Sequence, residues 1–294
     1  MRGLFVRIIP VICLCALLAG CGAGETEPTQ AAAETAETAM VEITETVAET
    51  VETVAQTEVI SAETEAVAEE TQAVLSANDA ENLPVMELPA VSEGPCHFYD
   101  DAAIMGDSIS YSLMVHHTRT KDFGNAVFLV RGSLGIHNTL NKQLSVSYQG
   151  QSMTPWDALA ASGVKKVFIM MGMNDIGYYS IDDTMEKWVT FLGNIREKCP
   201  NLEIYIESMP PMWNDAQQTL LNNDNIDAYN LRLQEFAAEN GCHFVDIAPY
   251  FKNSENGMAA IYCGDLYVHM NETGTAAWAT VLKAYSEGLE KETN

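Results

Sequence analysis

The sequence predicts an α/β fold in which one parallel sheet is covered by helices on both faces. Five short runs of apolar and β-branched residues carry this prediction, and they recur through the second part of the 294-residue chain: Ala102–Met105, Ala126–Val130, Lys166–Met171, Glu203–Glu207 and His243–Ile247. Segments with the period of an α-helix lie between them. Strands that alternate with helices are typical of a parallel sheet whose crossover helices pack on its two faces.

Three amphipathic segments are the most regular of the expected helices. The first, 183–198, starts after acidic capping candidates and stops before Pro200. The second ends at Asn240–Gly241, and the third begins at Thr273. Their apolar stripes are Met185, Trp188, Leu192 and Ile195 in the first, Ile226, Tyr229, Leu233 and Phe236 in the second, and Ala277, Val281, Tyr285 and Leu289 in the third.

Residues 1–20 have the features of an export signal. Two arginines give the segment positive charge, and its apolar core is shorter than the roughly 20 residues that a transmembrane helix needs. The signal runs into Leu18-Ala-Gly-Cys21, which resembles a bacterial lipobox and implies lipid attachment to Cys21. A lipid there anchors the protein to the membrane without spanning it. We therefore expect a bacterial cell-membrane lipoprotein whose domain faces the extracytoplasmic side, with an ordinary signal peptide as the less favoured alternative.

The segment 21–95 is expected to be a disordered tether. Residues 22–95 contain sixteen Glu, one Asp and no Lys or Arg, in irregular repeats with Thr, Ala and Val. Unpaired like charge and low complexity favour an extended, solvated chain. A flexible tether of this length has an end-to-end distance of about 50 Å. A helical stalk is the less favoured alternative, because Val47, Val51 and Val54 have helical spacing but no basic partner.

Residues 96–294 are long enough for one domain with a full core. The acidity of the tether argues against nucleic-acid partners, which require a basic face. We expect a monomer. The domain has four cysteines, an even number that allows one or two disulfides but equally allows free thiols: Cys96, Cys199, Cys242 and Cys263. Their spacing fits no zinc site.

Polar residues suited to ester chemistry follow the expected strands. Gly106-Asp-Ser108 ends the first run, Gly172-Met-Asn174-Asp175 follows the third, and Asp265-Leu-Tyr-Val-His269 precedes the last helix. A glycine-containing loop, Arg131-Gly-Ser-Leu-Gly135, follows the second run. Ligands of parallel sheets bind beyond the carboxyl ends of the strands, so these residues are expected to meet at one edge.

With these four blocks in this order, residues 96–294 resemble the SGNH, or GDSL-type, hydrolase superfamily. The resemblance implies a three-layer α/β/α sandwich with a five-stranded, flavodoxin-like parallel sheet, and a serine esterase without metal or organic cofactor. It implies that Ser108 is the nucleophile, His269 the general base and Asp265 the residue that orients it. The oxyanion hole would take backbone N–H groups from Ser108 and Gly135, with Gly132 as a competing glycine, and the side-chain amide of Asn174. The family's usual acid–base spacing has two intervening residues, whereas this chain has three.

The chemistry explains these residue types. A serine hydroxyl becomes nucleophilic when an imidazole removes its proton, and a carboxylate stabilises the resulting cation. Fixed donors stabilise the negative charge that develops on the carbonyl oxygen. The purely structural alternatives are that Ser108 only caps a helix and Asn174 only forms a turn. Asp107 is expected to serve structure through hydrogen bonds within the turn.

Other residues near the expected site have weaker signals. Tyr178, Tyr179 and Trp213 lie in loops at the expected active edge, where they could stack on a sugar or acyl group, although packing is the commoner role of such residues. His116 and His117 are expected on the surface of a helix.

Together these features predict an extracytoplasmic esterase that removes O-acyl groups, acetyl above all, from carbohydrate or cell-wall glycan. One alternative is an acyltransferase, in which a sugar hydroxyl replaces water. Another is a glycan- or solute-binding lipoprotein without turnover, which lipid anchoring would suit equally well.

Overall fold

The structure is a computed structural model that describes residues 83–293. The expected signal segment, the lipidation site Cys21 and the tether up to residue 82 lie outside the described residues. Among the helices of residues 83–293, none is both long and apolar enough to cross a bilayer.

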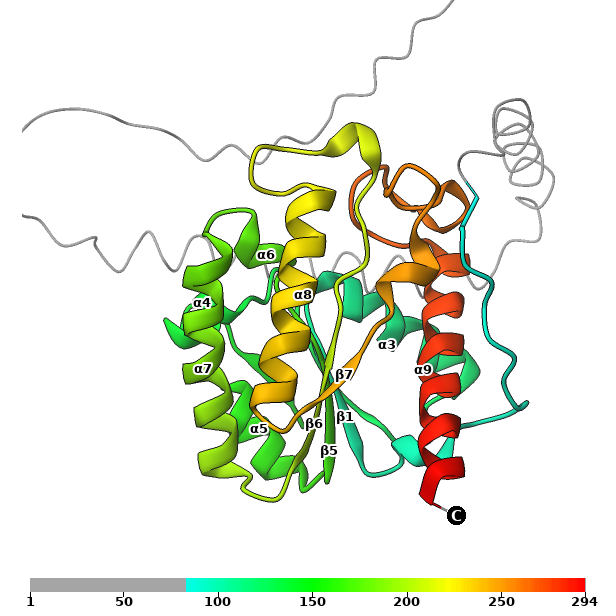
Figure 1. Cartoon of the computed structure of the whole chain (residues 1–294). Coiled ribbons are helices and arrows are strands. Elements are labelled where there is room, and N and C mark those ends of the chain that lie inside the picture. Colours follow the sequence, from blue (N-terminus) through cyan, green and yellow to red (C-terminus); the bar gives the residue numbers. More distant parts are fainter. Residues whose placement is uncertain (1–82, 294) are drawn as a thin grey trace, which may run out of the picture. The chain divides into compact units, whose positions relative to one another are not determined.

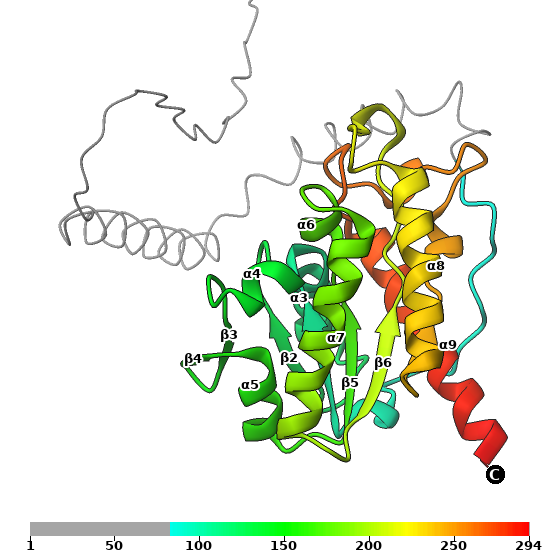
Figure 2. The ribbon, with the colours of Figure 1, turned by 60° about the vertical axis from the view of Figure 1, so that its left-hand side comes forward.

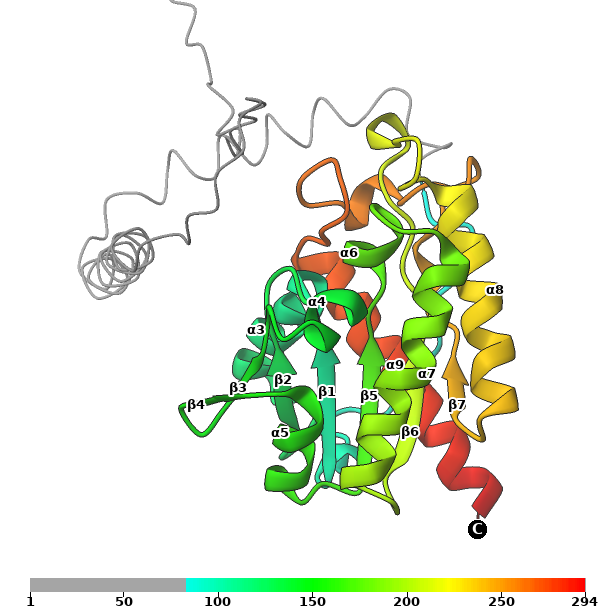
Figure 3. The same ribbon diagram turned by 90° about the vertical axis from the view of Figure 1, so that its left-hand side faces the viewer.

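The prediction of a five-stranded parallel sheet is confirmed. The strands lie in the order β2-β1-β5-β6-β7 and all pair in parallel, as the row of arrows in Figure 3 shows. Their bounds are Val127–Val130 for β2, Ala102–Gly106 for β1, Lys166–Met170 for β5, Glu203–Glu207 for β6 and His243–Val245 for β7. Each expected strand is found within two residues of its predicted ends.

Helices cover both faces of the sheet and complete the three layers (Figures 1 and 3). One face carries α3 (Ser108–Thr120) and α9 (Glu272–Thr293), and the other carries α5 (Pro155–Ser162), α7 (Ile181–Lys198) and α8 (Asn223–Glu239). Short α4 (Ile136–Leu140) and α6 (Met173–Ile176) lie at the carboxyl edge of the sheet. The described residues also contain the 3₁₀ turns η2 (His97–Tyr99), η3 (Asn214–Ala216), η4 (Ala248–Phe251) and η5 (Ala260–Tyr262).

A small antiparallel hairpin, β3 (Val146–Tyr148) and β4 (Gln151–Met153), projects beside the sheet (Figure 2). It leads into α5, which begins where Thr154 accepts a hydrogen bond from the Asp157 N–H at 3.3 Å and ends at Gly163 in the left-handed region, with φ 67°. Proline at the first position of α5 suits a helix start, because its missing N–H would have no acceptor there.

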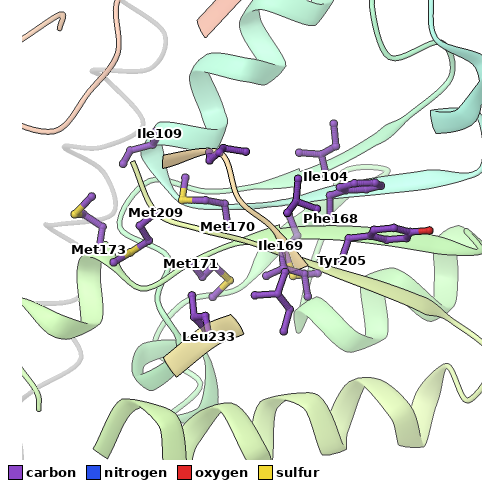
Figure 4. Close-up of a cluster of buried hydrophobic side chains, with 14 of the residues drawn as sticks. Ile104, Ile109, Phe168, Ile169, Met170, Met171, Met173, Tyr205, Met209 and Leu233 are labelled. Carbon is purple, nitrogen blue, oxygen red and sulfur yellow. The ribbon is translucent and has the colours of Figure 1, made fainter. Parts of the chain in front are cut away.

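The core lies on both sides of β1 and β5, which are buried along most of their length. On one side the rings of Phe168 and Tyr205 stack with centroids 4.4 Å apart, and on the other Met171 lies near Leu233 of α8 (Figure 4). Burying a side chain of this size contributes about 1.5–3 kcal/mol. This packing fixes the strand ends that carry the site.

Residues 83–95, the last part of the expected tether, contact the domain. The Val85 N–H donates to the Lys252 carbonyl at 2.9 Å, the Ser92 N–H to Glu287 at 2.8 Å, and Lys283 Nζ to the Gly94 carbonyl at 2.8 Å. The segment has no regular secondary structure and runs past α9 (Figure 1). The folded unit therefore begins before the expected boundary at residue 96.

The four cysteines of the domain, Cys96, Cys199, Cys242 and Cys263, are free thiols in this structure. The Cys96 thiol lies 3.1 Å from the Ser286 hydroxyl, and burial raises the pKa of both Cys199 and Cys242. Of the two possibilities that the sequence left open, the structure has the unpaired one.

One buried carboxyl group stands apart from the site. Glu207 ends β6 without solvent exposure, and one of its oxygens accepts a hydrogen bond from Trp278 Nε1 at 2.8 Å. Its other oxygen has no partner among the described residues. Burial raises the pKa of Glu207 to about 8.

We expect Gly106→Ala to destabilise the fold by about 3 kcal/mol, because a methyl group there would lie 2.1 Å from Ser110 Oγ and 2.5 Å from the Met170 carbonyl. Gly193→Ala in α7 is the matched control, since its methyl group meets nothing within 4 Å. Denaturant unfolding of both variants checks this. Equal midpoints for the two would contradict the tight approach of β1, β5 and α3.

Glu207→Gln should stabilise the protein increasingly as pH rises from about 4.5 to 8. In that interval the unfolded chain ionises Glu207 while the fold holds it protonated, so wild-type stability falls by up to about 1.4 kcal/mol per pH unit. Glutamine keeps an acceptor for Trp278 without the charge. The difference in unfolding free energy between variant and wild type should be larger at pH 8 than at pH 5. An equal difference at both pH values would contradict the raised pKa of Glu207.

Candidate active site

The first strand delivers Ser108 to the start of α3. Asp107, not Ser108, caps this helix: its Oδ1 accepts a hydrogen bond from the Ile109 N–H at 2.9 Å. The Ser108 hydroxyl is therefore not used as a cap, and it lies 2.9 Å from His269 Nε2. As the first residue of α3, Ser108 also has a backbone N–H without an intrahelical acceptor.

His269 is held by Asp265 in the loop before α9. The two side chains meet at 2.5 Å between His269 Nδ1 and Asp265 Oδ2, while Asp265 Oδ1 accepts hydrogen bonds from the Tyr267 and His269 N–H groups. Leu266 adopts the left-handed region, with φ 55°, and so absorbs the additional residue between acid and base. The unusual spacing therefore does not prevent contact.

Asn174 reaches the same place from α6. Its Nδ2 donates to Asp107 Oδ2 at 2.9 Å and to the Leu134 carbonyl at 3.2 Å. Burial raises the pKa of Asp107 to about 6, against the opposing effects of the Ile109 N–H and the nearby His269. Asp107 thus joins the nucleophile turn to the amide, in line with the structural role expected for it.

Asp175 ties the glycine-containing loop to α6. Its buried carboxylate accepts hydrogen bonds from the Ile136 and His137 N–H groups, each at 2.9 Å, and its burial raises its pKa. A methyl group on Gly135 would lie 2.9 Å from both of its oxygens. Glycine is required at 135 because the carboxylate approaches so closely.

The structure does not place Gly135 as the expected oxyanion donor. Its N–H already donates to Asn138 Oδ1 at 3.0 Å, as part of the start of α4. Neither Gly135 nor Gly132 lines the cleft at Ser108, whereas Ser133, with φ 60°, does. Because the Gly135 N–H is already bonded to Asn138, it could donate to an oxyanion only after that hydrogen bond breaks.

A cleft of about 270 Å³ surrounds these groups. Its floor is apolar and buried, and its rim is polar or aromatic and more exposed. The floor consists of Ile109, Met173, Leu221 and Val268, and the rim includes Ser133, Tyr178, Gln218 and Tyr267. A larger groove of about 630 Å³ between α7 and α8 contains none of the chemical groups described above, so volume alone does not mark the site.

The structure separates the three aromatic residues expected at this edge. Tyr178 is 79% exposed and lines the cleft. Tyr179 instead stacks on His137, with ring centroids 3.7 Å apart. Trp213 does not line the cleft, but its backbone N–H donates to the carbonyl of Tyr267. Tyr267 is a cleft residue that the sequence analysis missed, although it stands two positions before His269.

The expectation that His116 and His117 lie on a helix surface is wrong. Both are buried, because α3 packs against α9 as well as against the sheet. His116 Nε2 lies 2.9 Å from Asp122 Oδ2, and the His117 ring stacks on Phe128.

Comparisons with known proteins give the family and the fold. Residues 104–277 match the GDSL-like lipase/acylhydrolase family, whereas no curated relative matches the chain. Three similar solved structures each have a TM-score of 0.51. A protein from Streptococcus pneumonia assigned as a platelet activating factor is 19% identical, covering 66% of this chain and 84% of its own. A Bacteroides fragilis protein assigned as an acylhydrolase is 17% identical, and the match covers 71% of this chain and 93% of its own. A GDSL-like lipase from Bacteroides thetaiotaomicron is 15% identical, and the match covers 69% of this chain and 93% of its own. At these identities the likeness concerns the fold.

Leu266 gives a test of the acid–base loop. Leu266→Asn should preserve the loop and raise stability slightly, because asparagine tolerates φ of 55°, whereas Leu266→Val should cost about 1–2 kcal/mol. Leu266 is mostly exposed, so neither substitution changes the buried apolar area much. Thermal unfolding of the pair checks this, and a more stable valine variant would contradict the left-handed turn.

Proposed function

The chain belongs to the GDSL-like lipase/acylhydrolase family, and we propose that it hydrolyses short O-acyl esters of carbohydrate through Ser108, His269 and Asp265. Hydrolysis of ester bonds follows from the family. The hydrogen-bonded line from Asp265 through His269 to Ser108 is the observation that carries the proposed chemistry.

In the first step His269 Nε2 takes the Ser108 proton as the oxygen attacks the ester carbonyl. Asp265 accepts the hydrogen bond from Nδ1, which fixes the tautomer and stabilises the imidazolium. His269 then gives the proton to the departing alcohol oxygen, leaving an acyl group on Ser108. A water molecule, deprotonated by the same imidazole, releases the acid and restores the serine.

The developing oxyanion would be stabilised by the Ser108 N–H and by Asn174. One N–H of the Asn174 amide is held by Asp107, and the other reaches the Leu134 carbonyl at 3.2 Å. We infer that this second N–H turns to the oxyanion when substrate binds. An oxyanion donor of this kind stabilises the transition state by about 3–4 kcal/mol.

The cleft favours a short acyl group on a neutral alcohol. At about 270 Å³ it lies just below the roughly 300–1,000 Å³ range of small-molecule sites. Its apolar floor suits an acetyl methyl group, and its polar, aromatic rim suits a sugar. Among the described residues that line it, Asp107 carries the carboxyl group and His269 the basic side chain, and no lysine or arginine is present to pair with a charged alcohol.

Solvent access favours hydrolysis over acyl transfer. The His269 and Asp265 side chains are 42% and 36% exposed, so water can reach the acyl-enzyme from the rim. With the lipobox-like Cys21, we propose that the enzyme acts as a monomer at the extracytoplasmic face of a bacterial membrane. Glycan of the cell wall or outside the cell is then its nearest carbohydrate.

Ser108→Ala and His269→Ala should each lower kcat for acetylated oligosaccharide by about 10⁴-fold or more, because each removes the nucleophile or its base. His97→Ala is the matched control, since that histidine is largely exposed and outside the cleft. Acetate release measured by pH-stat checks all three. Near-native rates in either site variant would refute the assignment.

Asn174→Ala should lower kcat by about 10²–10³-fold. Asn174→Asp should be at least as harmful although it preserves the shape, because a carboxylate repels both the oxyanion and Asp107. Steady-state kinetics with circular dichroism as a fold check distinguishes the two effects. An active aspartate variant would show that Asn174 does not serve the oxyanion.

A further inference from the structure

The cleft rim carries two tyrosines, one exposed and one half-buried, that the catalytic chemistry does not use. Tyr178 follows α6 and is the most exposed large hydrophobic residue of the described chain. Tyr267 lies in the acid–base loop, and both tyrosines line the cleft. Burial raises the pKa of Tyr267, and the Tyr178 hydroxyl is near enough to raise it further.

The surroundings of this pair are fixed and polar. The Tyr267 hydroxyl accepts a hydrogen bond from Gln218 Nε2 at 3.1 Å, and the Tyr267 carbonyl accepts one from the Trp213 backbone N–H at 2.7 Å. The Gln218 amide and the Ser133 hydroxyl add hydrogen-bonding groups to the same rim. No lysine or arginine lines the cleft in the described residues, and Asp265 stands exposed beside it.

Exposed aromatic rings, neutral polar groups and the lack of a lining cation in the described residues favour an uncharged sugar as the ligand. The apolar C–H face of a sugar ring packs on aromatic side chains, and its hydroxyls pair with amides and hydroxyls. An anionic sugar would meet Asp265 without a cation to offset the repulsion. A long acyl chain would not use the polar rim.

We propose that Tyr178 and Tyr267 form a subsite that binds an uncharged sugar ring on the alcohol side of the ester. This inference rests on the proposed esterase function. The acyl group then faces the apolar floor, the ring packs against the exposed face of Tyr178, and Gln218 and the Tyr267 hydroxyl contact ring hydroxyls. Tyr178 is thus a specificity-determining residue, while Tyr179, stacked on His137, is not.

The test compares three esters: acetylated xylo-oligosaccharide, acetylated oligogalacturonide, and ethyl acetate, which has no ring. Wild type should prefer the neutral sugar ester to the anionic one by tenfold or more in kcat/KM. Tyr178→Ala should lower the ratio of kcat/KM on the neutral sugar ester to that on ethyl acetate by about tenfold, mainly through KM. Tyr178→Phe, which keeps the ring, should stay within about twofold.

Tyr111→Ala is the matched control, because Tyr111 is 49% exposed on α3 and outside the cleft. It should leave the ratio unchanged. An unchanged ratio in Tyr178→Ala, an equal fall in Tyr178→Phe, or a preference for the anionic ester would overturn the subsite.

Binding without turnover separates this proposal from the esterase itself. Titration calorimetry of Ser108→Ala with xylo-oligosaccharide should show binding that Ser108→Ala/Tyr178→Ala weakens about tenfold. If wild type cleaves none of the three esters, the proposed function fails, and this titration alone decides the subsite. Equal binding by both variants, or none by either, would overturn it.

Discussion

The hydrogen bond between Ser108 Oγ and His269 Nε2 joins residues 161 positions apart, and the proposed chemistry depends on it. The bond exists because all five strands run in parallel, so the loops that follow them gather at one edge. Gly106 lets β1, β5 and α3 approach closely enough to bring Ser108 to that edge. A fault in strand packing would therefore reach the site directly.

Two buried carboxylates, Asp107 and Asp175, hold the catalytic segments in place. Asp107 caps the helix that begins at Ser108 and holds the amide of Asn174. Asp175 fastens the neighbouring loop through two backbone N–H groups. Burying two carboxylates is costly unless their hydrogen bonds are satisfied, and here backbone donors and an amide satisfy them. The free energy that their burial costs holds the nucleophile turn, Asn174 and the neighbouring loop together before substrate arrives.

The sequence was sufficient for the sheet, because apolar runs of four to six residues with helical segments between them allow few other folds. It was also sufficient for the meeting of Ser108, Asn174 and His269. The β3–β4 hairpin was missed because its strands have three residues each and lie largely exposed. The helix α5 was missed despite a readable signal, the Thr154–Pro155 start.

Tertiary contacts and one local hydrogen bond account for the remaining differences. His116 and His117 carry no local sign that α9 and the sheet will cover their sides of α3. The N–H of Gly135 is occupied by Asn138 three residues later, a local bond that family resemblance does not reveal. Tyr267 and Gln218 become cleft residues only because the loop after β6 packs on the acid–base loop. Side-chain partners across loops are what single-sequence patterns do not encode.

Covalent labelling tests the central claim most directly. A phosphonate probe that reacts with activated serines should form one adduct, which peptide mapping by mass spectrometry should place on Ser108. The labelling rate should fall by orders of magnitude in His269→Ala, because the imidazole activates the hydroxyl. An adduct on another serine such as Ser110 or Ser133, or an unchanged rate without His269, would contradict the account.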